Sequence, residues 1–134
     1  MKETTKDWIE LARRDFYAAK TLAADEYLAN VCLFHCQQAI EKLFKAILEE
    51  HSLKIPRIHS VTTLFENLPS EFKDTSKIEL DDLELIDDIY IDSRYPGEIG
   101  LLPNGLPSKS DAENILCIAE NILQSVLKYI ETKI

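Results

Sequence analysis

The spacing of apolar residues along the chain predicts helices. Between residues 5 and 24 they recur at steps of three and four, which is the period of a helix with one buried face. The members of this stripe are Trp8, Leu11, Ala12, Ala19, Leu22 and Ala23. Thr4 or Thr5 is expected to cap this first helix, because a hydroxyl oxygen can accept a hydrogen bond from the first-turn amides.

A second helix is predicted over residues 27–50, with two faces of different character. Its apolar stripe consists of Cys32, Cys36, Ile40, Leu43 and Ile47, widened by Leu33, Ala39 and Phe44. At 100° per residue the opposite face carries His35, Gln38, Lys42, Lys45 and Glu49. Phe34 falls within this polar side. A large aromatic there predicts that the polar side is also covered, by another helix or by another subunit.

The rest of the chain predicts three more helices and two loops. A short helix over 61–67 is expected to be capped by Ser60, and 68–76 reads as a loop. An acidic helix follows over 78–91, and 92–108 reads as a long loop because it holds all three glycines. The last helix is expected to begin near Ser110 or Asp111 and to end near 132. We therefore predict an all-α single domain over 1–134, an antiparallel up-and-down helical bundle of four main helices plus a short fifth.

Charge and cysteine usage limit the partners. The net charge is −9, so bare duplex DNA is not an expected ligand, whereas a nucleotide or a local RNA contact needs only a few positive groups. The three cysteines, Cys32, Cys36 and Cys117, do not form a disulfide or zinc pattern, which favours buried free thiols in a reducing compartment. Without a signal sequence or an apolar run of membrane length, a cytoplasmic protein with no membrane contact is expected.

The polar side of the second helix is the first candidate site. His35, Gln38 and Lys42 lie on one strip, where they could hydrogen-bond a base or ribose and neutralise a phosphate. The alternative is a structural polar layer whose groups satisfy one another. Arg94 and Tyr95 form a second candidate, because a guanidinium in a loop can grip a phosphate or carboxylate through two hydrogen bonds.

A combined hypothesis is that these two candidates converge. Arg94, His35 and Lys42 together would make one anion site; alternatively, Arg94 pins the long loop to the carboxylate of Glu41 or Asp15. His59 and Glu41 are secondary candidates, with a local hydrogen bond or helix cap as the alternative role for His59. Asp81, Glu84 and Asp88 share a face of the acidic helix, but they lack a histidine partner and a calcium-loop glycine, so no metal or cofactor is expected.

Several segments resemble the HEPN domain family. The strongest runs from Phe34 to Lys42 and continues in Lys45 and Ala46. Weaker matches follow in the family's order, at Trp8, Ala12, Asp15 and Ala18, at His59 and Leu64, at Arg94-Tyr95-Pro96, and at Asp111-Ala112. The resemblance implies an up-and-down bundle that is commonly dimeric. It also implies a member of a group often encoded beside a small nucleotidyltransferase, in many cases as a toxin–antitoxin pair.

The resemblance stops at the family's nuclease pattern. Its metal-independent ribonucleases carry an arginine followed, four to six residues later, by a histidine. No arginine here precedes any histidine by that spacing; the chain has His35, His51 and His59, and Arg13, Arg14, Arg57 and Arg94. We therefore expect a non-catalytic module that binds a nucleotide or a nucleotidyltransferase partner. The alternatives are a ribonuclease with a rearranged site, using His35 or His59 with Arg94, and a purely structural oligomerisation module.

Overall fold

The computed structural model describes residues 1–94 and 107–132, and side chains at 1–89 and 107–132. Every regular element in these ranges is a helix, which confirms the predicted all-α class. Two of the helices, α3 and α4, are only six residues long, and η1 is a single 3-10 turn. In chain order they are α1 (Glu3–Leu22), η1 (Glu26–Leu28), α2 (Ala29–Glu50), α3 (Val61–Glu66), α4 (Ser70–Thr75), α5 (Leu80–Arg94) and α6 (Lys109–Thr132).

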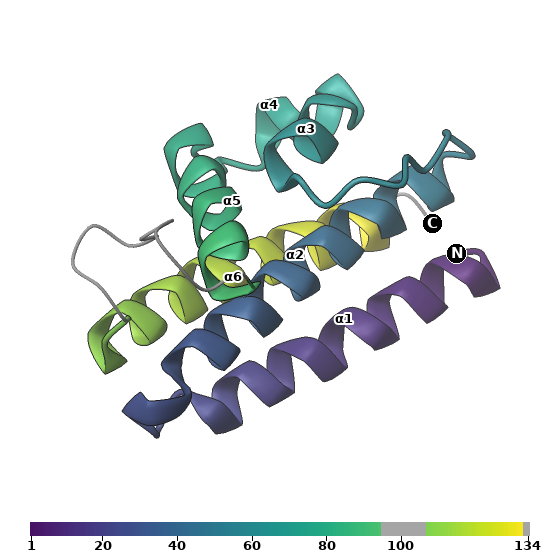
Figure 1. Cartoon of the computed structure of the whole chain (residues 1–134). Helices are drawn as coiled ribbons and strands as arrows, with labels where there is room; N and C mark the ends of the chain where they lie inside the picture. The colour runs from purple at the N-terminus through teal and green to yellow at the C-terminus, as the bar shows by residue number, and fades with distance from the viewer. Residues whose placement is uncertain (95–106, 133–134) are drawn as a thin grey trace.

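Helices α2 and α6 run the same way, α1 runs in the opposite direction, and α5 crosses α2 and α6 at a steep angle (Figure 1). Two hydrogen bonds link the matching ends of α2 and α6. At the starting ends the Lys109 backbone N–H donates to Glu26 Oε2 over 2.9 Å, and at the far ends Tyr129 Oη lies 2.9 Å from His51 Nε2. The result is an up-and-down bundle in which α5 is the shorter third member.

Helix α2 lies at the centre of the bundle. It contacts α1, α3, α5 and α6, and 14 of its 22 residues are buried. The predicted apolar stripe is buried throughout, from Cys32 to Ile47. The face predicted to be polar is partly covered as well: Lys45 is buried, His35, Gln38, Lys42 and Glu49 are half-buried, and α1 of the same chain packs against this helix.

The first helix differs from its prediction in two places. It begins at Glu3, so Thr5 is not a cap; its side chain is fully buried and its hydroxyl donates to Glu50 Oε1 over 2.9 Å. Leu11 is 47% exposed, so its place on the predicted stripe was wrong. The buried face of α1 instead consists of Ile9, Ala12, Phe16 and Ala19. Leu11 precedes Ala12 by one residue, so its side chain points about 100° away from that face.

The loop predicted over 68–76 is wrong, because it contains α4. Phe72 is buried and packs edge-on against Tyr129, with 5.1 Å between ring centroids. Six residues are too few to show a helical period, and a single buried aromatic provides the tertiary contact that stabilises so short a helix. The helix ends at Thr75, Ser76 is its C-cap, and Lys77 then has φ of 60°. Glycine is usual at that position, and a side chain there costs roughly 1 kcal/mol.

The C-terminal half also departs from prediction. Helix α5 continues to Arg94 and α6 begins at Lys109, so the predicted loop 92–108 is shorter, and residues 95–106 lie outside the described part of the chain. Cys117 is exposed, which corrects the expectation of three buried thiols; Cys32 and Cys36 are buried. In the ranges the structure describes, none of the helices is both long and apolar enough to cross a bilayer.

Candidate functional site

The carboxylate of Asp15 on α1 joins two candidate residues of α2. His35 Nδ1 lies 2.8 Å from Asp15 Oδ1, and the Lys42 ammonium donates to Asp15 Oδ2. His35 and Lys42 are nearly two helical turns apart, so one carboxylate spans the space between them. All three side chains are partly buried, with Asp15 13% exposed. We call Asp15, His35 and Lys42 the Asp15 cluster.

A second carboxylate, Glu41, organises the neighbouring part of the same helix. Its Oε2 accepts from Lys45 Nζ over 3.1 Å, and its Oε1 lies 2.9 Å from His59 Nδ1 and accepts from Gln37 Nε2 over 3.3 Å. Gln37 Nε2 also donates to the His59 carbonyl over 2.7 Å. Gln37, Glu41 and Lys45 are buried, whereas the His59 side chain is 56% exposed, so this Glu41 cluster of four residues reaches from the interior to the surface.

Gln38 lies between the two clusters along α2. Its Nε2 donates to Gln37 Oε1 over 2.7 Å, which connects it to the Glu41 cluster. Lys45 has a further contact, since its Nζ lies 5.8 Å from the centroid of the Trp8 ring on α1. The candidate strip is therefore a polar layer of two hydrogen-bonded clusters, one between α2 and α1 and the other between α2 and the segment before α3.

Helix α3 is held by Asp87 of α5, and this in turn places His59. Asp87 accepts from the Val61 backbone N–H over 2.7 Å, from the Thr62 N–H over 3.2 Å and from the Ser60 hydroxyl over 2.9 Å. Ser60 also accepts from the Thr63 N–H, so its predicted cap is confirmed. Two side chains thus satisfy the first amides of α3, which a helix cannot satisfy by itself.

The charges of the strip balance within the chain. Asp15 faces Lys42 and Glu41 faces Lys45, one carboxylate for each ammonium. The carboxylate beside His35 favours the tautomer in which Nδ1 carries the proton and donates it to Asp15. Nε2 of that ring is then an acceptor. This arrangement can orient an imidazole and hold a proton at a known nitrogen, but its lysines already have anionic partners.

The predicted site residues divide into two groups. Gln38, Glu41, His35, Lys42 and His59 all belong to the polar layer just described. The Arg94 side chain and Tyr95 lie outside the described residues, so their convergence on this layer stays a prediction. Among the described residues, no three histidine, cysteine or acidic side chains come together as a metal site.

Sequence reasoning gave too little weight to Asp15, Gln37 and Lys45. The sequence analysis names Asp15 only as a match to the family and as an alternative partner for Arg94. Asp15 nevertheless lies beside the buried face of α1, where a charged side chain needs a partner. Gln37 is fully buried and lies between Leu33 and Ile40 in the helical repeat. A polar residue in an apolar register is the signal that could have identified both.

The comparisons with known proteins agree with this architecture. The model of the HEPN domain matches residues 5–129. A Methanocaldococcus jannaschii protein named "Putative toxin MJ1304" is 33% identical over 137 residues, covering 96% of this chain and 89% of that protein.

Two solved structures share the fold. TT1696 from Thermus thermophilus has a TM-score of 0.75 at 24% identity, with 95% of this chain and 98% of that chain covered. ST0689, described as an archaeal HEPN homologue, has a TM-score of 0.71 at 27% identity, with 97% and 99% covered. The residues matched by the HEPN model, 5–129, include every residue of the polar layer and the helices that carry it. The chain belongs to the HEPN domain family.

Proposed function

We propose that this protein is a non-catalytic HEPN module of the toxin–antitoxin type, which acts by binding a nucleotidyltransferase partner. The observation that carries the proposal is the charge balance of the strip. Lys42 pairs with Asp15, and Lys45 pairs with Glu41. The most family-like segment of the chain therefore uses its cations within the fold, one to link α2 to α1 and the other to pair with a carboxylate of α2 itself.

This balance disfavours RNA cleavage. Metal-independent cleavage needs an acid or base near neutral pKa and a cation that stabilises the charged phosphorane. Within the described part of the strip, both ammonium groups face carboxylates, and the net charge of −9 opposes the approach of a polyanion. A helical module that binds a protein does not need either group to be free.

The toxin–antitoxin setting is supported by a relative. The similar protein of Methanocaldococcus jannaschii carries the name of a toxin, and the alignment covers most of both chains. Pairing with a nucleotidyltransferase extends what the family resemblance implies to this chain. We also propose a homodimer, because Phe34 is only partly buried in the single chain, where its ring meets His35 edge-on at 5.5 Å.

Nucleotide binding at the strip, as part of the same proposal, depends on Asp15. A phosphate could reach Lys42 only in competition with the carboxylate already there. Asp15→Asn should then raise affinity for a nucleotide about tenfold, the effect of removing one charged competitor. Isothermal titration of the wild type and this variant with the same nucleotide measures the difference. An unchanged or lower affinity in the variant would place nucleotide binding elsewhere or nowhere.

One observation favours the ribonuclease alternative. Asp15 orients His35 so that Nε2 is an acceptor, the geometry that a general base requires. This alternative would need a cation from outside the strip, and Arg94 is its candidate.

Co-expression tests the proposal directly. The chain would be expressed with any nucleotidyltransferase found to be encoded beside its gene, and the purified material would be sized by light scattering. We expect a stable complex, and no cleavage of RNA in chelator by the chain alone. The matched comparison is His35→Asn, which removes the candidate base but leaves a polar side chain. RNA cleavage by the wild type that disappears in His35→Asn would overturn the non-catalytic proposal, and so would the absence of any complex.

A further inference from the structure

A small hollow lies at the surface where α1 meets the last turn of α2. It is lined by Thr4, Asp7, Trp8 and Leu11 of α1 and by Glu49 of α2, and its volume is about 170 Å³. Small-molecule sites usually measure about 300–1,000 Å³, so this hollow has room for one side chain of a partner rather than for a whole metabolite. We call it the Trp8 hollow.

The apolar part of the Trp8 hollow is exposed beyond what the core requires. Leu11 is 47% exposed, and Trp8 packs against the core but is itself only partly buried. These two side chains are three residues apart on α1, so they are neighbours on the helix surface. Exposed apolar surface with a polar rim is typical of interaction sites, and tryptophan is one of the residues that contribute most to protein interfaces.

The charged side chains that line the Trp8 hollow are both carboxylates. Among the described residues, neither Asp7 nor Glu49 forms an ion pair, whereas Glu10 of the same α1 helix pairs with Arg14 over 3.2 Å. The Lys2 ammonium lies near Glu49, but it donates to the Glu49 backbone carbonyl over 2.9 Å. The hollow therefore presents two carboxylates that have no ion-pair partner in the described part of the chain.

The Trp8 ring already contacts one cation of its own chain. Lys45 Nζ lies 5.8 Å from the ring centroid, as expected from the attraction between a positive charge and the electron-rich face of an indole. Lys45 also pairs with Glu41 over 3.1 Å and is only 10% exposed. Its charge is therefore balanced inside the fold, and it does not neutralise Asp7 and Glu49 at the surface.

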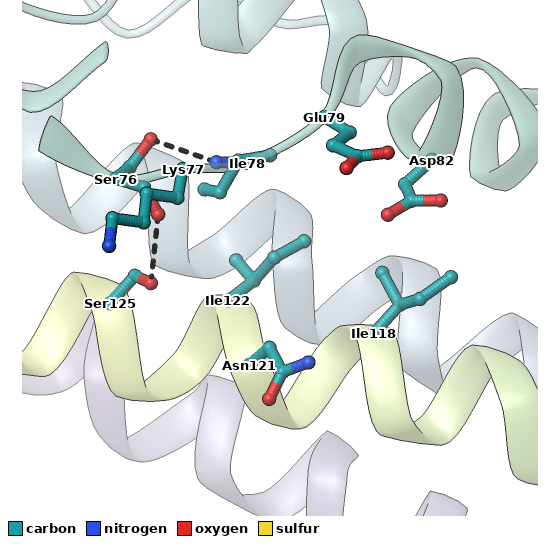
Figure 2. A pocket seen from close by; sticks show the side chains of 9 residues that line it. All are labelled: Ser76, Lys77, Ile78, Glu79, Asp82, Ile118, Asn121, Ile122 and Ser125. Atoms are coloured by element: carbon teal, nitrogen blue, oxygen red, sulfur yellow. Dashed lines mark hydrogen bonds between the residues drawn. The ribbon is translucent and has the colours of Figure 1, made fainter. Parts of the chain in front are cut away.

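The larger hollow between the α4–α5 connection and α6 does not select one sign of charge. Figure 2 shows Lys77 at one end of it, whereas Glu79 and Asp82 lie at the other end. Because its charges have both signs, this hollow favours neither a cationic nor an anionic partner. The Trp8 hollow combines an aromatic ring with carboxylates alone, so it favours a positively charged group.

We propose that the Trp8 hollow is a docking site for an arginine side chain of a protein partner. The flat guanidinium would lie on the Trp8 ring and donate to the carboxylates of Asp7 and Glu49, while its apolar stem would cover Leu11. Arginine fits better than lysine because a guanidinium is planar, weakly hydrated and able to donate two parallel hydrogen bonds to one carboxylate. The contact does not depend on which protein supplies the arginine, so it goes beyond the function proposed above.

Fluorescence titration of the untagged full chain tests the proposal, because Trp8 is the only tryptophan. The probes are three short peptide amides that differ only in their central residue, which is arginine, lysine or citrulline, the uncharged analogue of arginine. The variants are Asp7→Asn, Glu49→Gln and Leu11→Ala. Asp81→Asn is the control, because Asp81 is an exposed carboxylate outside the hollow and its loss changes the net charge equally. Circular dichroism establishes that each variant is folded.

We expect the arginine peptide to change the Trp8 emission with a dissociation constant of about 1 mM, as is reasonable for a contact through one side chain. The citrulline peptide should bind about tenfold more weakly because it lacks the charge, and the lysine peptide about threefold more weakly. Asp7→Asn and Glu49→Gln should each weaken the arginine peptide about fivefold, the upper limit for an exposed ion pair.

Leu11→Ala should weaken the arginine peptide about threefold, because the stem then loses apolar contact, and Asp81→Asn should match the wild type. The proposal is overturned by a wild type that does not bind the arginine peptide, or by citrulline or lysine peptides that bind as tightly as arginine. Unchanged affinity in both carboxylate variants would also overturn it, and so would an equal loss in Asp81→Asn.

Discussion

Removing the charge of Glu41 is the sharpest test of the polar layer inside the bundle. Glu41→Gln keeps the shape of the side chain and an oxygen that can still accept from Gln37 and His59. It leaves Lys45, whose side chain is only 10% exposed, without its anionic partner at 3.1 Å. An uncompensated buried charge is expensive because neither water nor a counterion replaces the lost partner.

The size of the effect follows from that burial. Breaking a buried pair by removing one partner costs about 3–5 kcal/mol, and the retained hydrogen bonds place Glu41→Gln near the lower limit, about 3 kcal/mol. For a chain of 134 residues the entropy of unfolding at the midpoint is about 0.28 kcal/mol/K, so the melting temperature should fall by about 10 °C. The loss should be smaller for Lys45→Met, because Gln37 Nε2 still donates to the Glu41 carboxylate.

Urea unfolding followed by far-UV circular dichroism gives these free energies, and fluorescence gives a local readout. The only tryptophan, Trp8, has the Lys45 ammonium 5.8 Å from its ring centroid, so its emission should change in both single variants. The double variant Glu41→Gln/Lys45→Met removes both charges. Its loss of stability should be less than the sum of the two single losses, since no orphan charge remains.

Two results would refute this reasoning. The first is a loss below about 1 kcal/mol for Glu41→Gln, the size expected of a solvent-exposed pair. The second is a double variant whose loss equals the sum of the single losses, because additivity means that Glu41 and Lys45 do not interact.

Three further predictions test other parts of the structure. The backbone N–H of Lys2, with the Thr5 hydroxyl, lowers the pKa of Glu50 below its ordinary 4.5; this carboxylate therefore stabilises the fold at neutral pH, and the contribution is lost as the pH falls through the folded-state pKa. Thermal unfolding from neutral pH to about pH 3 should show a shallower acid loss in Glu50→Gln. A thiol reagent should modify one cysteine per native chain, the exposed Cys117, and the other two only in denaturant, since Cys32 and Cys36 are fully buried. A hydrogen bond with Cys32 and burial also raise the pKa of Cys36. Asp87→Ala should cost about 2 kcal/mol and speed amide exchange at the start of α3, where Asp87 accepts two backbone N–H groups; unchanged exchange there would contradict its anchoring role.

Much of the fold was predictable because α2 and α6 have long, unambiguous repeats. The stripe from Cys32 to Ile47 is buried as predicted, and Ser60 caps α3 as predicted. Helix α4 was not predictable from local pattern, because its one buried residue, Phe72, is fixed by a contact with Tyr129 far along the chain. The predicted burial of Leu11 was wrong for a similar reason, because a shift of one residue around the helix separates a buried face from an exposed one.

The candidate site was predictable in its residues and not in their partners. The spacing of His35 and Lys42 places both on one face of α2, but it does not indicate that a single carboxylate of α1 binds both. The position of Asp15 depends on how α1 packs against α2, and periodicity carries no information about that register.

The two ends of the described chain have a practical consequence for experiments. The Lys2 backbone N–H donates to Glu50 over 3.1 Å, and Tyr129 lies against His51, so both ends lie beside the last turn of α2 (Figure 1). An affinity tag or a fluorescent dye attached at either end would emerge from the same pole of the bundle. A donor and acceptor dye pair placed there would report folding by energy transfer, while the opposite pole, where α2 and α6 begin, would stay clear for a binding partner.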